Sequence, residues 1–278
     1  MAITNFIPTV WSENLAKSLD KKYTGVAHCN REYEGEIKNI GSVVKICGVG
    51  KVNVENYTKN TDMTTPQTLD DTVRELKINQ AKYFNFQIDD VDRAQCTPKL
   101  MDAAMSVAAE ALADEADRYV YSLASKTQLI NTIGFSTPEA LVDFIIDSRQ
   151  MITNSGTVDA SQLVLEVSPR VATQLLKAKM NMLSDNTPAL ENGYIGSIAG
   201  CKVFVSKNIL VTALEEEHVH SCLLRTTRAV AFAEQLSEIE AYRPEKRFAD
   251  AVKGLHLYGA TIVYPEEFAV IEVVFDPQ

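Results

Sequence analysis

The stretch Thr97–Ser125, TPKLMDAAMSVAAEALADEADRYVYSLAS, carries the strongest helical pattern in the chain. Its apolar residues recur at steps of three and four, which is the period of a helix with one buried face: Met101, Met105, Ala108, Leu112, Ala116, Tyr119 and Leu123. Thr97 suits the N-cap and Pro98 the first helical position. The pattern predicts one helix from Pro98 to about Ser125, roughly 40 Å long, whose alanines allow close packing.

Upstream of this helix, residues 32–89 form a β-rich excursion. The run SVVKICGVGKVNVENY alternates around Gly48 and Gly50, which predicts a local hairpin. Thr58–Thr72 then contains almost no apolar side chains, and strand-like alternation resumes in ELKINQAKYFNFQID. A long polar tip between strands is unusual inside a compact domain. We therefore expect a β-arm that leaves the body of the protein.

The two flanks complete an α+β reading of the chain. Residues 1–31 look like an arm, with helical spacing of apolar residues from Trp11 to Leu19. Downstream, Thr137-Pro138 and Ser168-Pro169 each open a helix, the second directly after the strand QLVLEV. Residues 130–232 thus form a mixed α/β unit, and the remaining runs are strand-like: AVAFA, EIEAY, VKGLHLYGATIVYP and FAVIEVVF.

Composition excludes several classes of protein. The chain has 278 residues and a formal net charge of −10, so it offers no broad basic face for nucleic acid. Five cysteines without a CxxC pair favour free thiols in a reducing cytoplasm over a disulfide framework. No apolar run approaches the ~20 residues that span a bilayer, and no signal peptide is recognisable.

The glycine-rich stretch Gly193–Ile209, GYIGSIAGCKVFVSKNI, resembles a phosphate loop only in composition. A dinucleotide site needs GxGxxG between a strand and a helix, whereas here the strand KVFVS follows the glycines. No GxxxxGK[ST] and no GxSxG are present. We therefore interpret the stretch as a loop and a tight turn that enters a strand.

The best metal candidate is EEEHVHSC, in which His218, His220 and Cys222 alternate and would share one face of a strand. Nothing in the sequence clearly supplies a fourth ligand, and a polar turn that leads into a strand explains the pattern equally well. IDDVDRAQ fails as a calcium loop because Gln95 stands where a glycine is required. His28-Cys29 are neighbours in sequence, which alone makes no catalytic pair. We expect no catalytic group, no cofactor and no metal.

Five stretches in order resemble the major capsid proteins of tailed bacteriophages, the Hong Kong 97-type fold. They are FIPTVWSENLAKSL, NREYEGEIKNIGSVVKI, KYFNFQIDDVDRAQ, GYIGSIAGCKVFVSKNI and FADAVKGLHLYGATIVYPEEFAVI. The resemblance covers nearly the whole chain and implies an α+β fold of four parts. Residues 1–31 would be the N-arm, 32–89 the extended β-hairpin loop, 90–129 and 233–278 the peripheral domain with its spine helix, and 130–232 the axial domain.

The resemblance also implies function and partners. The protein would be a non-enzymatic head protein that assembles with itself into hexamers and pentamers of an icosahedral shell. That shell would enclose double-stranded DNA without sequence-specific binding, in the virion after assembly in the host cytoplasm. A separate scaffolding protein, a portal and decoration proteins are further expected partners, and no membrane is. Candidate inter-subunit contacts are Phe6, Trp11, Tyr57 and Lys59.

Two departures limit what the resemblance implies. The arm-like sequence starts at Met1, so any scaffold is expected to be a separate protein. The type member joins its subunits through a loop lysine and a late asparagine, but this chain has no asparagine after Asn208, so we expect no such cross-link. Two alternatives remain: a cellular nanocompartment shell of the encapsulin type, and an α+β metalloenzyme built around His218, His220 and Cys222.

Overall fold

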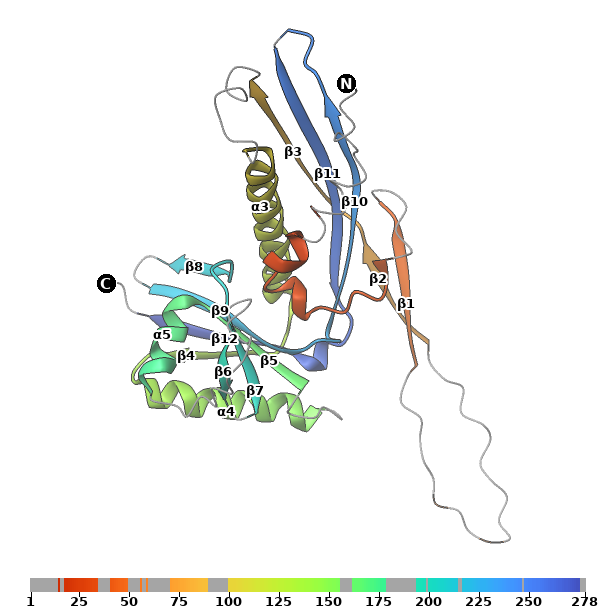
Figure 1. Ribbon diagram of the computed structural model, residues 1–278. Coiled ribbons are helices and arrows are strands. Elements are labelled where there is room, and N and C mark those ends of the chain that lie inside the picture. Colours follow the sequence, from red (N-terminus) through yellow and green to blue (C-terminus); the bar gives the residue numbers. More distant parts are fainter. Residues whose placement is uncertain are drawn as a thin grey trace.

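The structure is a computed structural model that describes residues 15, 18–34, 41–49, 56, 59, 71–89, 100–155, 162–178, 194–198, 200–214, 217–246 and 248–275. The described chain forms two units that meet near the end of one long helix (Figure 1). We call them the three-stranded unit and the seven-stranded unit, after their main sheets.

The three-stranded unit consists of a long antiparallel sheet and one helix. The sheet has the order β10-β11-β3, with β3 at Gln80–Asp89, β10 at Val230–Tyr242 and β11 at Ala249–Ile262. Helix α3, Leu100–Ser122, lies along one face of this sheet and ends in the 3-10 turn η3, Leu123–Lys126 (Figure 1). The predicted long helix is therefore confirmed, whereas Thr97 and Pro98 lie outside the described residues.

The packing of α3 follows its small residues. Ala109, Ala113 and Ala116 are fully buried, and with Leu112 and Val120 they form the contact side of the helix. Small side chains let the helix axis approach the sheet closely, so that the larger residues of β10 and β11 fill the space between them. Phe232 and Tyr258 supply this bulk from the strands.

The β-excursion begins with strands β1, Val43–Val49, and β2, Asp71–Lys77, which pair with each other from Val43↔Lys77 to Val49↔Asp71. The predicted local turn at Gly48 is wrong, because Gly48 lies inside β1 opposite Thr72. Burial decides this register. Val44, Ile46, Leu76 and Ile78 point inward and pack on Ala231, Ala233 and Leu257 of the three-stranded unit.

The seven-stranded unit is a mixed sheet in the order β4-β12-β9-β5-β7-β6, with β8 paired to β9. Its strands are β4 Ile130–Gly134, β5 Leu163–Val167, β6 Tyr194–Ile198, β7 Cys201–Val205, β8 Val211–Leu214, β9 Glu217–Thr226 and β12 Phe268–Phe275. Helix α4, Pro138–Ser155, lies beneath the sheet, on the side away from α3 (Figure 1). Residues of α4 and of α5, Pro169–Lys177, share one core cluster with the sheet.

Both predicted helix starts in this unit are confirmed. The Oγ of Ser168 accepts a hydrogen bond from Val171 N at 3.4 Å, and Thr137 Oγ1 accepts one from Ala140 N at 3.2 Å. The predicted inward face of α4 is also confirmed, since Leu141, Ile145 and Ile152 are at most 2% exposed.

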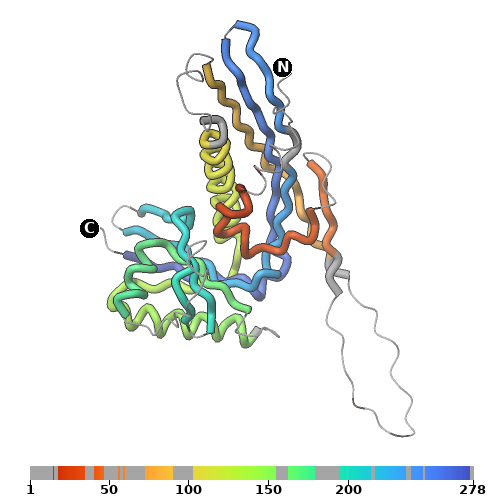
Figure 2. Tube along the Cα trace, viewed as in Figure 1, coloured from red at the N-terminus to blue at the C-terminus, as the bar shows by residue number. Residues whose placement is uncertain are grey.

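Two strands pair differently from their grouping by sequence, as the tube trace makes visible (Figure 2). β3 closes the expected excursion of residues 32–89, yet it pairs with β11 and so lies in the three-stranded unit. β12 lies in the expected peripheral segment 233–278, yet it pairs with β4 and β9 of the other unit. Its run Phe268–Ile271 is buried on both faces, as expected for a strand inside a sheet that is covered on both sides.

Candidate functional site

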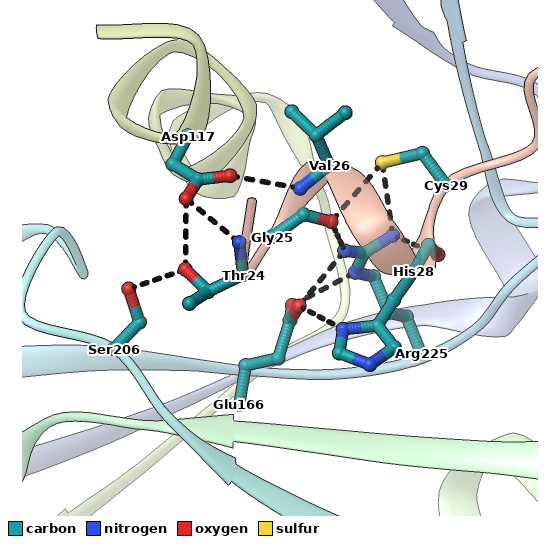
Figure 3. A network of polar contacts seen from close by, with 9 residues as sticks. All are labelled: Thr24, Gly25, Val26, His28, Cys29, Asp117, Glu166, Ser206 and Arg225. Carbon is teal, nitrogen blue, oxygen red and sulfur yellow. Dashed lines mark hydrogen bonds and ion pairs between the residues drawn. The ribbon is translucent and has the colours of Figure 1, made fainter. Parts of the chain in front are cut away.

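The polar centre of the molecule lies where an N-terminal segment, residues 18–34, passes between the two units (Figure 3). The segment is helical at residues 18–22 and forms the 3-10 turn η1 at Val26–His28. Leu19, Tyr23 and Val26 are buried in the same core cluster as α3. Because a short irregular segment cannot satisfy its own backbone groups, it requires partners from the surrounding elements.

Asp117 of α3 supplies the first set of partners. Its carboxylate, on a residue only 1% exposed, accepts hydrogen bonds from Thr24 N at 2.9 Å, Thr24 Oγ1 at 2.8 Å and Val26 N at 2.9 Å. Burial raises the pKa of Asp117, and the three donors offset part of that rise. The carboxylate therefore holds the start of η1 against the helix.

Arg225 of β9 and Glu166 of β5 supply the second set. The Arg225 guanidinium donates to Glu166 from Nε at 2.9 Å and from Nη2 at 3.0 Å, and both side chains are at most 1% exposed. Its remaining donors reach the segment, at Gly25 O and His28 O, both at 2.8 Å. Figure 3 shows the guanidinium between the carboxylate and these two carbonyl groups.

His28 and Cys29 both lie beside this pair: His28 Nδ1 is 3.2 Å from Glu166 Oε1, and Arg225 Nη1 is 3.4 Å from Cys29 Sγ. Burial alone would raise the pKa of Glu166, but Arg225 and His28 hold it below the ordinary value. Burial raises the pKa of the Cys29 thiol to about 11. A buried thiol with that pKa is no nucleophile near neutral pH, so the adjacent His28 and Cys29 do not form a catalytic pair.

Glu234 of β10 anchors the segment to the three-stranded sheet. It accepts a hydrogen bond from Tyr23 Oη, one from Arg31 Nη2 at 2.6 Å, and one from His256 Nε2 at 2.8 Å. Burial acts to raise the pKa of Glu234, but these neighbours, with His256 foremost, keep it below the ordinary value. Asn30 adds a backbone bridge to β10, with N donating to Val230 O at 2.8 Å.

These four anchors, Asp117, Glu166, Arg225 and Glu234, are not among the site residues predicted from the sequence. A signal for two of them was present: Glu166 and Arg225 interrupt the apolar strand sequences LVLEV and CLLRT. A charged residue in a strand buried on both faces requires a partner. The partners lie far apart in sequence, so the chain order alone did not identify them.

The candidate metal ligands share a face of β9, as their alternation predicts. His218 is half-buried there, whereas His220 and Cys222 are buried. Cys222 is 1% exposed and belongs to the core cluster that the sheet shares with α4 and α5. Burial raises its pKa to about 12. The His220 ring meets the Phe275 ring edge-on at 5.2 Å, and burial lowers its pKa. Among the described residues, no group of three His, Cys, Asp or Glu side chains could hold a metal ion. The arrangement does not favour the metalloenzyme alternative.

The glycine-rich stretch is a β-hairpin. Tyr194–Ile198 forms strand β6 where we expected a loop, and it pairs with β7 up to Ile198↔Cys201. Gly200 has φ +86° in the turn between the strands, a backbone conformation that suits glycine. The tight turn into the strand KVFVS is confirmed, and in the described part of the chain no α-helix follows that strand to hold a phosphate. Gly193 lies outside the described residues.

The expected inter-subunit contacts are only partly within the described chain. Phe6, Trp11 and Tyr57 lie outside it, and Lys59 is exposed at a turn. Elsewhere, large apolar side chains are strongly exposed on the three-stranded unit: Tyr83 at 78%, Phe248 at 82% and Val107 at 69%.

An open groove lies where β2, η3 and the end of β11 meet. Its volume is about 630 Å³, and its charged lining residues are Arg74, Lys126 and Glu266. These residues carry both signs of charge, and the described residues that line the groove include no histidine or cysteine. It offers no recognisable constellation for acid–base or nucleophilic chemistry.

Solved structures with the same fold include phage capsid proteins and a virus-like particle. A structure from Mycobacterium phage Che8 is 26% identical, with a TM-score of 0.69 over 89% of this chain and 90% of that one. The capsid of Ralstonia phage GP4 is 11% identical, with a TM-score of 0.68 over 94% and 91%. A virus-like particle from Pyrococcus furiosus is 14% identical, with a TM-score of 0.57 over 95% and 98%. No protein-family profile and no curated protein sequence matches the chain.

The chain therefore has the fold of phage major capsid proteins, and the resemblance found in the sequence is confirmed. The α+β class and the Hong Kong 97-type fold are those of these neighbours, which support a capsid shell protein with a structural role. Within the described part of the chain, no helix is both long enough and apolar enough to cross a bilayer.

Proposed function

We propose that this protein is the major capsid protein of a tailed phage, which assembles with itself into hexamers and pentamers of an icosahedral shell around double-stranded DNA. The observation that carries the proposal is the match to the Mycobacterium phage Che8 structure, at 26% identity over 89% of the chain. A match that spans both units and the connections between them is more specific than one to a single sheet.

The four parts expected from the sequence enter this proposal with one adjustment. Residues 1–31 act as the N-arm and the β1–β2 hairpin as the base of the extended loop. The three-stranded unit with α3 is the peripheral domain, and the seven-stranded unit is the axial domain. By strand pairing, β3 is assigned to the former and β12 to the latter.

The exposed apolar residues support assembly with other copies. Phe248, 82% exposed, follows the turn between β10 and β11, and Tyr83, 78% exposed, lies on the edge strand β3. Covering such side chains stabilises an interface by about 25 cal/mol per Å² of apolar area. Phe6, Trp11, Tyr57 and Lys59 are proposed as further contacts between subunits.

Electron microscopy of the purified full-length protein tests the proposal. We expect closed shells with five- and six-fold capsomers, formed alone or with a separate scaffolding protein co-expressed. A protein that stays monomeric at high concentration, with every candidate scaffold tried, would show the proposal to be wrong. A portal and decoration proteins are proposed partners in the virion, and assembly is proposed to occur in the host cytoplasm.

A nanocompartment shell is the second candidate, and the virus-like particle from Pyrococcus furiosus supports it. The contents of shells purified from the natural source distinguish the two candidates. Nuclease-protected double-stranded DNA supports the phage capsid, whereas a stoichiometric enclosed protein without DNA supports the nanocompartment.

A further inference from the structure

The chain crosses between the two units three times, and all three crossings meet at one edge. They are η3, the turn at residues 227–229, and the link at residues 263–267 that contains η6, Pro265–Glu267. Hydrogen bonds join the second and third crossings: Val263 N donates to Ala229 O at 2.8 Å, and Thr226 Oγ1, directly before the turn, donates to Glu267 Oε2 at 2.6 Å. Units connected at one edge can rotate about it unless a second contact fixes their angle.

Apolar packing extends from this edge, since Leu223, Phe268 and Val270 of the seven-stranded unit share a core cluster with α3. Beyond it the N-terminal segment lies between the units. Figure 3 shows the segment with α3 on one side and the strands that carry Glu166 and Arg225 on the other. The segment is therefore placed to transmit or to resist a rotation of one unit relative to the other.

The segment is attached differently to the two units. To the three-stranded unit it is joined by backbone bonds at Asn30, by the three bonds to Asp117, and by the Glu234 contacts. To the seven-stranded unit, the described polar contacts are made by side chains of that unit alone: Arg225, Glu166 and Ser206, whose Oγ lies 3.0 Å from Thr24 Oγ1. The segment is thus part of the three-stranded unit, and side chains of the seven-stranded unit bind it from the other side.

We infer that the N-terminal segment is a clasp that fixes the angle between the two units, and that the buried Arg225–Glu166 pair is its fastener. The guanidinium has its donors divided between a carboxylate of its own sheet and two carbonyl groups of the segment. Buried ion pairs add little net stability over apolar residues of similar size, but they demand one geometry. The pair therefore selects an orientation, and rotation of the units requires the guanidinium to leave both carbonyl groups.

Three exposed ion pairs provide reporters for this inference. Lys207 Nζ and Asp114 Oδ2 lie 2.9 Å apart across the two units. Lys82 and Glu115 lie 3.0 Å apart within the three-stranded unit, and Lys22 joins the segment to Glu110 of α3 at 3.1 Å. A carbodiimide couples an amine to a carboxylate only when the two are in contact. The yield of each cross-link, measured by mass spectrometry on the full chain, thus reports one contact.

The test removes the fastener without leaving a buried charge, in the double variant Arg225→Met with Glu166→Gln. We expect the Lys207–Asp114 cross-link to fall about tenfold, because the units are no longer held at one angle. The other two cross-links should stay unchanged, because the segment remains with α3. Arg74→Met, the same substitution at an exposed arginine, is the matched control and should change none of the three.

Each other outcome overturns the inference. Unchanged yields at all three pairs would mean that apolar packing and the Asn208–Asp114 hydrogen bond set the angle without the pair. A loss of the Lys22–Glu110 cross-link alone would mean that the segment detaches while the units stay in place. A loss of all three would mean that the pair only stabilises the fold. Arg225→Lys, which keeps the charge but loses the fork geometry, should give a smaller fall at Lys207–Asp114 and provides a test if the double variant does not fold.

Discussion

Gly259 of β11 is the position where adding one methyl group should lower the free energy of unfolding most, because the backbone of residues 77 and 78 passes directly over it. A Cβ at this position would lie 2.2 Å from Lys77 O and 3.1 Å from Ile78 Cα. To reach even 3.0 Å, the Lys77 carbonyl group would have to move by about 0.8 Å. That movement displaces Leu76 and Ile78, which anchor the β1–β2 hairpin on the three-stranded sheet.

The magnitude for Gly259→Ala follows from two opposing effects. Overpacking against an immobile group costs ~1–3 kcal/mol, at the upper end here because the obstacle is backbone. Replacement of glycine also stiffens the unfolded chain, which returns ~0.4–1 kcal/mol. We expect a net loss of about 2 kcal/mol, or a urea midpoint lowered by about 0.7 M for a slope of ~3 kcal/mol per M.

Two other glycines serve as graded controls in the same urea titration. At Gly254 the three atoms nearest to an added Cβ all belong to the Phe84 ring, the first at 2.4 Å. A partly buried ring can swing aside, so Gly254→Ala should cost about 1 kcal/mol. At Gly134 the Cβ meets nothing within 4 Å, so Gly134→Ala should stay within about 0.5 kcal/mol of the parent. If Gly259→Ala and Gly134→Ala unfold at the same urea concentration, the close approach of the hairpin base to β11 does not exist.

Four further predictions use other features of the chain. The pKa of Glu166 is lowered in the folded protein, so its contribution to stability is present above the ordinary glutamate pKa of ~4.3 and is lost as the pH falls toward the folded pKa. The urea concentration at the unfolding midpoint should therefore decrease as the pH is lowered below ~4.3. This decrease should be less steep in Glu166→Gln. Trp11 should be buried by a neighbouring subunit, so its fluorescence should shift to the blue on assembly and Trp11→Ala should impair shells while sparing monomer circular dichroism; a spectrum already blue in the monomer contradicts this. Replacing residues 56–71 by a short Gly-Ser linker should leave a folded monomer that assembles poorly, and normal shells from it would refute the role of the loop. The purified protein should contain no stoichiometric zinc; a zinc signal that disappears in His220→Ala would restore the metalloenzyme alternative.

The sequence by itself determined the local elements, because their causes are local. The helical step of apolar residues in Thr97–Ser125 requires a helix whichever surface it meets, and α3 follows it. Ser168 and Thr137 cap the N-termini of their helices, because their hydroxyl oxygens accept hydrogen bonds from backbone N–H groups three residues later. The sequence also predicted that Gly193–Ile209 is not a phosphate loop, because the strand that follows its glycines is adjacent to them in the sequence.

Only the tertiary structure decided which strands pair and which charges meet. Alternation around Gly48 is compatible with a local turn and with a longer strand. Burial against Ala231 and Leu257, about 180 and 210 residues later in the sequence, selects the strand. The four anchors of the N-terminal segment are similarly remote: Asp117, Glu166, Arg225 and Glu234 lie 91 to 211 positions from the partners they hold. A buried charge is stabilised by the groups that lie within a few ångströms of it. Which groups these are depends on how the sheets pack, and the order of residues in the sequence does not give it.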